Sequence, residues 1–127
     1  MALELGLMNT PVNNIKEISP KELAERLAKN EAFLILDVRE TWEAARVRLK
    51  NDRVVLAPLS KLAAQGAQAL PEVATNQEME IVVVCHHGAR STQVTAWLQQ
   101  SGWKNVQSLA GGLDAYARQV DPSIGTY

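Results

Sequence analysis

The sequence lacks several features that would define a class of protein, and each shortage excludes something. It holds a single cysteine in 127 residues, so the chain cannot close an internal disulfide, and we expect a reducing, cytoplasmic compartment. Neither sign of charge is in excess, because 13 basic and 14 acidic residues leave a net charge of −1. Nothing in this balance favours binding to nucleic acid, and we expect no such partner.

Long apolar runs are also missing. No run approaches the ~20 residues that a membrane-spanning helix needs, and residues 1–6 (MALELG) have neither the basic start nor the apolar stretch of a signal peptide. We therefore expect no membrane partner. What remains is an ordinary globular composition, 46% hydrophobic and 21% charged, at a length that fits one domain. We place an N-terminal tail over 1–14, the domain over 15–120 and a C-terminal tail over 121–127.

Short apolar runs alternate with helical patterns along the domain. The runs at 33–36, 54–56 and 81–84 are continuous, without polar residues in between, which is typical of strands buried on both faces of a parallel sheet. Expected strands lie near 15–18, 33–36, 54–56, 81–84 and 106–109. Expected helices lie over 20–30, 41–46, 60–70, 91–100 and 113–120. The alternation predicts an α/β fold: a single domain with a central, mostly parallel sheet and helices on both faces.

The one cysteine stands where such a fold binds its ligands, beyond the carboxyl end of a strand. Cys85 follows the apolar run 81–84 and opens the segment Cys-His-His-Gly-Ala-Arg-Ser, residues 85–91, which leads into a helical pattern. A tight loop between a strand and a helix N-terminus points several backbone N–H groups at one spot and stabilises an anion there. We therefore expect Cys85 to ionise readily and to act as a nucleophile.

The loop also supplies the expected anion-binding groups. Gly88 gives the backbone freedom that a tight turn needs. Arg90 offers a forked donor to a sulfonate-like group, and Ser91 can either cap the helix or donate its hydroxyl to sulfur. The expected substrate-binding residues are His86, His87, Gly88, Ala89, Arg90 and Ser91.

The two histidines of the loop allow two interpretations. They are either exposed residues without a chemical role, or one of them forms an imidazolium that favours the Cys85 thiolate. Metal binding by Cys85, His86 and His87 is not expected, because adjacent residues fit poorly around one ion and the usual ligand spacing is missing. We therefore predict neither a metal nor a cofactor.

Three pieces of the sequence together resemble the rhodanese family, the single-domain sulfurtransferases. They are Leu-Asp-Val-Arg-Glu at 36–40, the loop at 85–91 and Leu-Ala-Gly-Gly at 109–112, in the order of the family. The resemblance implies an α/β fold and a cysteine, here Cys85, that carries sulfane sulfur as a persulfide. The implied reaction takes sulfur from thiosulfate or another donor and passes it to a thiophilic acceptor, such as cyanide, a thiol or a thioredoxin-like protein.

Residues beyond the loop are expected to support it. Asp37 and Arg39 follow a neighbouring strand, and we expect them to brace the loop rather than to contact the substrate. Four residues separate Cys85 from Arg90, whereas protein tyrosine phosphatases have five, and a tighter nest suits one extra sulfur better than a phosphoryl group. Since the chain has no second thiol to resolve a persulfide, the sulfur has to leave to an external acceptor.

One departure from the family leaves the physiological partner open. The family usually carries a Gly-His pair between its first motif and the next strand, but residues 44–51 here read AARVRLKN. The basic residues from Arg46 to Arg53 form either a solvated edge or a surface that attracts an anionic donor or an acidic partner. The alternative to a thiosulfate enzyme is therefore a sulfur-relay module that exchanges sulfur with a protein and turns over little thiosulfate.

Overall fold

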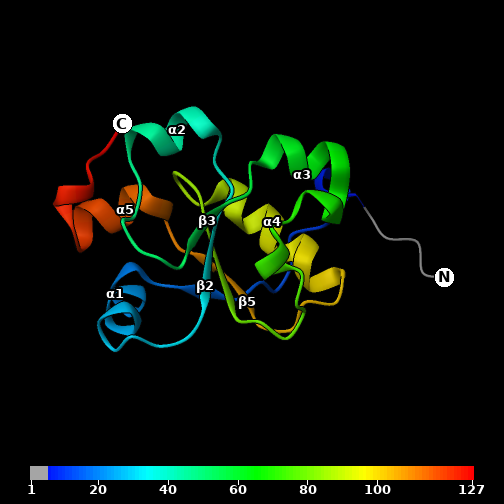
Figure 1. The fold of residues 1–127 in the computed structure, drawn as a ribbon, viewed down its shortest axis with the longest axis horizontal. Helices are drawn as coiled ribbons and strands as arrows, with labels where there is room; N and C mark the ends of the chain where they lie inside the picture. Colours follow the sequence, from blue (N-terminus) through cyan, green and yellow to red (C-terminus); the bar gives the residue numbers. More distant parts are fainter. Residues whose placement is uncertain (1–5) are drawn as a thin grey trace.

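Five parallel strands form the centre of the computed structural model, which describes residues 6–127 (Figure 1). The strands are β1 (Glu17–Ile18), β2 (Leu34–Asp37), β3 (Val54–Leu56), β4 (Ile81–Val84) and β5 (Val106–Leu109). Their order across the sheet is β1-β5-β4-β2-β3, and each neighbouring pair is parallel. The predicted fold class is confirmed, and the strand that leads into Cys85 is the central one. The first five residues of the expected N-terminal tail lie outside the described residues.

Helices cover both faces of this sheet. The α-helices are α1 (Pro20–Ala28), α2 (Thr41–Arg46), α3 (Leu59–Gln65), α4 (Ala89–Gln100) and α5 (Gly112–Gln119). The short 3-10 turns are η1 (Leu7–Asn9), η2 (Gly66–Ala69), η3 (Glu72–Ala74) and η4 (Pro122–Ile124). Figure 1 shows α1 and α5 on one side of the strands and α3 and α4 on the other. Across residues 6–127, no helix is both long and apolar enough to cross a bilayer.

Successive residues of the central strands point to opposite faces of the sheet and therefore enter two separate cores. Leu36 and Val83 pack with residues of α3 and α4, whereas Ile35 and Val82 pack with residues of α1 and α5. All four side chains are fully buried. Since burying one such side chain contributes about 1.5–3 kcal/mol, the two cores hold β4 firmly and fix the position of the loop that follows it.

The helix predicted over 60–70 is shorter in the structure. It ends at Gln65, and Gly66 follows with φ = 65°. A positive φ is favourable for glycine but not for other residues, so the α-helical path stops there and the chain continues as a 3-10 turn.

The helix predicted over 91–100 begins two residues earlier, at Ala89. Gly88, at φ = 103°, turns the chain from the loop directly into the helix. Arg90 and Ser91 consequently lie within the first turn of α4 rather than before it.

Candidate active site

The Cys85 sulfur lies at the carboxyl edge of the sheet, directly after β4. Its Sγ accepts hydrogen bonds from the N–H groups of Gly88 at 3.1 Å and Ser91 at 3.2 Å. The thiol also donates to the Ser91 Oγ at 3.4 Å, and Cys85 is 1% exposed. The loop therefore forms a compact nest around the sulfur, with two of its N–H groups on Sγ in the part of the chain described.

Ser91 occupies a buried position between the sulfur and the sheet. Its Oγ lies 3.4 Å from the Cys85 Sγ, 3.1 Å from the carbonyl oxygen of Gly88 and 2.7 Å from the Oγ of Ser108. Of the two predicted roles, capping the helix is wrong, because α4 starts before Ser91. The contact between its hydroxyl and the sulfur is the one that the structure shows. Ala89, also expected at the site, begins α4 and has an exposed side chain.

The N-terminus of α5 holds the loop from the other side. The N–H of Leu113 donates to the carbonyl of Cys85 at 2.8 Å, and the N–H of Asp114 donates to that of His86 at 3.0 Å. This approach requires glycine at Gly112, because a Cβ there would lie 2.3 Å from the His86 carbonyl oxygen. The first-turn N–H groups of α5, which lack partners within the helix, thus fix the backbone on which Cys85 sits.

Arg90 is paired with a carboxylate that the sequence did not single out. Its guanidinium donates to both carboxylate oxygens of Glu43, at 2.6 and 2.7 Å. Glu43, on α2, is 4% exposed and also accepts the backbone N–H of Glu40 at 2.9 Å and the hydroxyl of Tyr127 at 2.9 Å. The hydrogen bonds from Arg90 lower the pKa of Glu43 to about 2, and the same pair raises the pKa of Arg90. The fork that we expected to bind an anionic donor is therefore occupied within the protein.

Asp37 and Arg39 form a second, fully buried ion pair at the end of β2. The guanidinium of Arg39 donates to the two Asp37 oxygens at 2.9 and 2.7 Å, and neither residue is more than 2% exposed. Burial opposes the charge on Arg39, but the bonds to Asp37 outweigh it, so the pKa of Arg39 is raised. Arg39 Nη1 also donates to the backbone carbonyl of Glu43 at 3.4 Å. The Asp37–Arg39 pair thus contacts Glu43, which in turn holds Arg90.

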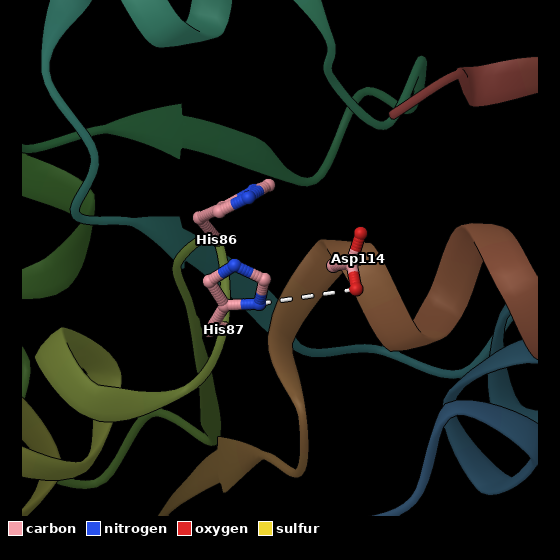
Figure 2. A group of neighbouring side chains, drawn as sticks. All are labelled: His86, His87 and Asp114. Carbon is pink, nitrogen blue, oxygen red and sulfur yellow. Dashed lines mark ion pairs between the residues drawn. The ribbon is translucent and has the colours of Figure 1, made fainter. Parts of the chain in front are cut away.

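His86 and His87 stand on the outer side of the loop, facing α5 (Figure 2). Their ring centroids are 3.9 Å apart, and the His87 Nδ1 lies 3.8 Å from the Asp114 Oδ2. The His87 side chain is 67% exposed, whereas the Nδ1 of His86 is buried and has no hydrogen-bond partner within the described residues. Burial lowers the pKa of His86, which disfavours an imidazolium of this ring beside the sulfur.

Asp114 completes a cluster that the sequence analysis missed. His86, His87 and Asp114 each offer one ligand atom, and these atoms lie within 4.8 Å of one another. They could hold a metal ion, although Asp114 is also engaged by Arg118 at 3.0 Å. Metal binding was not expected from the sequence because Cys85, His86 and His87 are adjacent. Asp114 is distant in the sequence, and only the fold brings it to the two histidines.

The segment after α2 presents a row of cations near this edge of the sheet. Arg46, Arg48 and Lys50 are exposed and alternate with the buried Val47 and Leu49. We call these three cations the basic face. Across residues 6–127 they form no ion pair or side-chain hydrogen bond, and they line a hollow of about 710 Å³. A second hollow, of about 580 Å³, is lined by two of them and by the end of β2.

Arg53 differs from the basic face although the sequence grouped them together. Its guanidinium donates to the carbonyl of Glu31 at 2.9 Å and to the side chain of Asn30 at 2.7 Å. It therefore ties the end of α1 to the start of β3 and belongs to the framework of the fold.

The sequence analysis missed four residues of the site, and they differ in how much signal the sequence carries for them. These residues are Glu43, Ser108, Asp114 and Tyr127. Glu43 carries a weak signal, because it lies three residues after Glu40 at the start of a predicted helix, where a carboxylate can bind a free backbone N–H. The other three carry none, since each reaches the site through the fold alone.

Sequence and fold comparisons point to one family. The family model for the rhodanese-like domain matches residues 19–119. The thiosulfate sulfurtransferase GlpE from Haemophilus influenzae is 30% identical over 112 residues, which cover 88% of this chain and 97% of that protein. The rhodanese-like/PpiC domain-containing protein 12, chloroplastic, from Arabidopsis thaliana is 37% identical over 117 residues. That match covers 89% of this chain, which spans 38% of the longer Arabidopsis protein.

A solved structure supports the same assignment at the level of the fold. The rhodanese-like domain protein from Staphylococcus aureus superimposes with a TM-score of 0.69 at 24% identity, over 89% of this chain and 99% of that one. The family match includes β2, the Cys85 loop and α5, which are the elements that build the site. The chain therefore belongs to the rhodanese-like domain family, as its three sequence motifs predicted.

Proposed function

We propose that the chain is a thiosulfate sulfurtransferase in which Cys85 carries the transferred sulfur as a persulfide. The proposal is supported above all by the two N–H groups that lie on the Cys85 Sγ, from Gly88 and Ser91. Such N–H groups favour an anionic sulfur. The reaction needs an anionic sulfur twice, first as the attacking thiolate and then as the persulfide.

The first half-reaction exchanges one S–S bond for another. The Cys85 thiol loses its proton to solvent, and the thiolate attacks the outer sulfur of thiosulfate. A bond forms between Sγ and that sulfur, while the bond to the central sulfur breaks and its electron pair leaves with sulfite. The product is a Cys85 persulfide whose negative charge stays beside the N–H groups of the loop.

The second half-reaction returns the enzyme to its starting state. An acceptor such as cyanide or a thiolate attacks the outer sulfur of the persulfide, the S–S bond breaks, and its electron pair returns to the Cys85 thiolate. Because Cys85 is the only cysteine, the acceptor is external, and a small thiol or a thioredoxin-like protein in the cytoplasm fits this role. Each step is a displacement at sulfur.

Arg90 and its partners act on this chemistry through the backbone. While Glu43 holds both arms of the Arg90 fork, the N–H groups of the loop are the donors left for an anionic substrate. We assign to the Arg90–Glu43 pair the task of fixing the first turn of α4, which carries the Ser91 N–H. The Asp37–Arg39 pair supports it from behind, as a brace rather than a substrate contact.

A protein-partnered sulfur relay is the second candidate function, and the basic face favours it. Three cations without counter-ions among the described residues lie on an extended segment next to the end of β2. Such a surface attracts an acidic protein and speeds its encounter with the site. In this function, sulfur passes between Cys85 and a biosynthetic protein, and turnover of thiosulfate is low.

Intact-mass measurement tests the first candidate. The protein is incubated with excess thiosulfate, the donor is removed, and the wild type is compared with Cys85→Ser. We expect one added sulfur on the wild type alone, lost again on adding cyanide or a thiol. Sulfur uptake by Cys85→Ser would contradict the mechanism.

The two candidates are separated by their donors. The rate of persulfide formation is measured with thiosulfate and with the protein-bound persulfide of a cysteine desulfurase. Faster transfer from thiosulfate supports the enzyme, whereas transfer from the protein donor alone supports the relay.

A further inference from the structure

Tyr127 lies at the site although it is 42 positions beyond the nucleophile in the sequence. Its hydroxyl donates to the Glu43 Oε1 at 2.9 Å and accepts a hydrogen bond from Arg39 Nη1 at 3.3 Å. The hydroxyl therefore joins the Glu43–Arg90 pair to the Asp37–Arg39 pair. We had expected residues 121–127 only as a tail, yet this tyrosine bonds to both ion pairs of the site.

The ring of Tyr127 covers the residue next to the nucleophile. It stacks on the ring of His86, with centroids 4.1 Å apart and planes inclined by 29°. Trp42, from α2, packs edge-on against the Tyr127 ring, with centroids 6.3 Å apart. Aromatic rings from three segments thus meet at the residue that follows Cys85, which is itself 1% exposed.

The segment that leads to Tyr127 is anchored rather than loose. After α5, Asp121 accepts the N–H of Ser123 at 3.0 Å and starts the turn η4. Ile124 packs against the core beneath α1 and α5. Gly125 follows with φ = 84°, a conformation in which glycine lets the chain change direction. The chain then returns along α2 to the site, as the position of the C label beside α2 in Figure 1 shows.

We propose that Tyr127 determines which sulfur donors reach Cys85: its ring, held over His86 by Glu43 and Arg39, narrows the approach to the sulfur and excludes bulky donors. This inference rests on the sulfurtransferase function proposed above and specifies its substrate class. Small inorganic donors such as thiosulfate pass, whereas donors that carry an aromatic group are slowed. The hydroxyl fixes the ring, and the ring provides the selectivity.

The Arg90 guanidinium also indicates that Tyr127 lies near the Cys85 loop. Arg90, whose fork is held by Glu43, is close enough to both Cys85 and Tyr127 for each to contribute to raising its pKa, after the larger effect of Glu43. The Tyr127 hydroxyl and Arg90 Nη2 also share one acceptor, the Glu43 Oε1, at 2.9 and 2.7 Å.

The test compares two donors that differ in bulk. Thiosulfate and benzenethiosulfonate both give up an outer sulfur, with sulfite and benzenesulfinate as the leaving groups that keep the electron pair. Persulfide formation is followed by intact mass for the wild type, Tyr127→Ala and Tyr127→Phe. We expect Tyr127→Ala to raise the rate with benzenethiosulfonate relative to thiosulfate by about fivefold or more, as one stacked aromatic contact would suggest. Tyr127→Phe keeps the ring but loses the hydrogen bonds that fix it, so its ratio should lie between those of the wild type and Tyr127→Ala.

Two outcomes would overturn the proposal. If Tyr127→Ala has the same donor ratio as the wild type, the ring does not select donors. If Tyr127→Phe changes the ratio as much as Tyr127→Ala does, the hydroxyl rather than the ring is responsible. Thr126→Ala, next to the tyrosine on the same segment, is the matched control and should leave all rates unchanged. Thermal unfolding of each variant shows whether a rate change reflects folding.

A readout that needs no sulfur transfer separates this proposal from the proposed function. Since Cys85 is the only cysteine, the alkylation rate of the protein reports on this one thiol. Tyr127→Ala should accelerate alkylation by N-phenylmaleimide about fivefold more than alkylation by the small reagent iodoacetamide. If this result is found without sulfur uptake from thiosulfate, it supports the shielding of Cys85 by the Tyr127 ring and contradicts the thiosulfate enzyme. Sulfur uptake from thiosulfate with equal acceleration of both alkylation reactions would support the thiosulfate enzyme and contradict the selection of donors by Tyr127.

Discussion

The Cys85 loop and the rim around it are built by different means. In the loop, backbone N–H groups make the contacts: those of Gly88 and Ser91 lie on the sulfur, and that of Leu113 lies on the Cys85 carbonyl. In the rim, by which we mean the side chains around Arg90 and Tyr127, contacts join segments as far as 88 positions apart. Backbone geometry needs only a few residue types at fixed spacing, whereas the rim depends on individual side chains. The loop is therefore the part suited to a shared reaction, and the rim is the part that can differ between relatives.

Breaking the loop should have the largest effect. In Gly112→Ala, the new Cβ would lie 2.3 Å from the His86 carbonyl oxygen, at a φ of +67°. We expect a loss of about 3 kcal/mol in the free energy of unfolding and slower sulfur uptake, measured by urea denaturation and intact mass. Gly6→Ala is the control, because a Cβ there meets nothing within 4 Å and should change stability by less than about 0.5 kcal/mol. Equal stability of the two variants would contradict the tight contact with α5.

Acid should weaken the rim through Glu43. The bonds from Arg90 lower the pKa of Glu43 from 4.5 to about 2, so folding favours the ionised carboxylate. Its contribution, about 3 kcal/mol at ~1.4 kcal/mol per pKa unit, is complete above pH 4.5 and is lost as the pH falls through 2. Glu43→Gln should be less stable at pH 7, and its stability should decline less between pH 5 and 2 than that of the wild type.

Urea denaturation at several pH values measures this difference. The exposed Glu25 provides the control, because Glu25→Gln removes a carboxylate that makes no side-chain bond within the described residues. A parallel pH dependence of Glu43→Gln and the wild type would show that the Arg90 pair does not stabilise the fold.

Ser91 tests the comparison between the loop and the rim, because it belongs to the loop but contacts the sulfur with its side chain as well as with its N–H. Ser91→Ala removes the hydroxyl 3.4 Å from Sγ and leaves the N–H in place. We expect persulfide formation to slow about fivefold, equivalent to one hydrogen bond of ~1 kcal/mol. Thr95→Val on the same helix is the control, because the Thr95 hydroxyl is buried without a hydrogen-bond partner in the described part of the chain. An unchanged rate in Ser91→Ala would leave the backbone N–H groups as the sole contributors.

Charge reversal of the basic face should have the smallest effect on the chemistry. With Arg46, Arg48 and Lys50 replaced by Glu, we expect turnover with thiosulfate and cyanide to change by about twofold or less. Transfer to an acidic protein acceptor should slow several-fold at low ionic strength, and added salt should then change the transfer rate of the variant only little. The matched control reverses three exposed lysines: Lys16 and Lys104, which precede β1 and β5, and Lys29, the C-cap residue of α1. Lys104 forms an exposed ion pair with Glu78 at 3.1 Å. Equal effects of the two triple variants would remove the basic face as a docking surface.

The sequence was sufficient for the parts that backbone geometry dictates. Continuous apolar runs predicted β2 and β4, which are buried along their whole length, and the strand–loop–helix pattern around Cys85 predicted the nest. The positive φ at Gly88 is also as expected. The start of α4 was misplaced, because a glycine before the first turn was not recognised as the boundary.

The rim could not be predicted, for physical reasons. Arg90 was expected to bind an anion, and an anion does bind it, but the anion is Glu43 from another helix. Nothing local distinguishes a carboxylate that crosses to α4 from one that faces water. Tyr127 gives no signal either, since its position depends on where η4 and Gly125 direct the chain.

The contact between α5 and the loop also implies an order of events during synthesis. The Cys85 and His86 carbonyls find their partners on α5, and β1, the first strand to be made, pairs with β5, the last. A nascent chain that ends before β5 and α5 therefore contains Cys85 but lacks both the complete sheet and the contacts that hold the Cys85 loop. On the ribosome, this loop gains its final support only when nearly the whole domain has emerged.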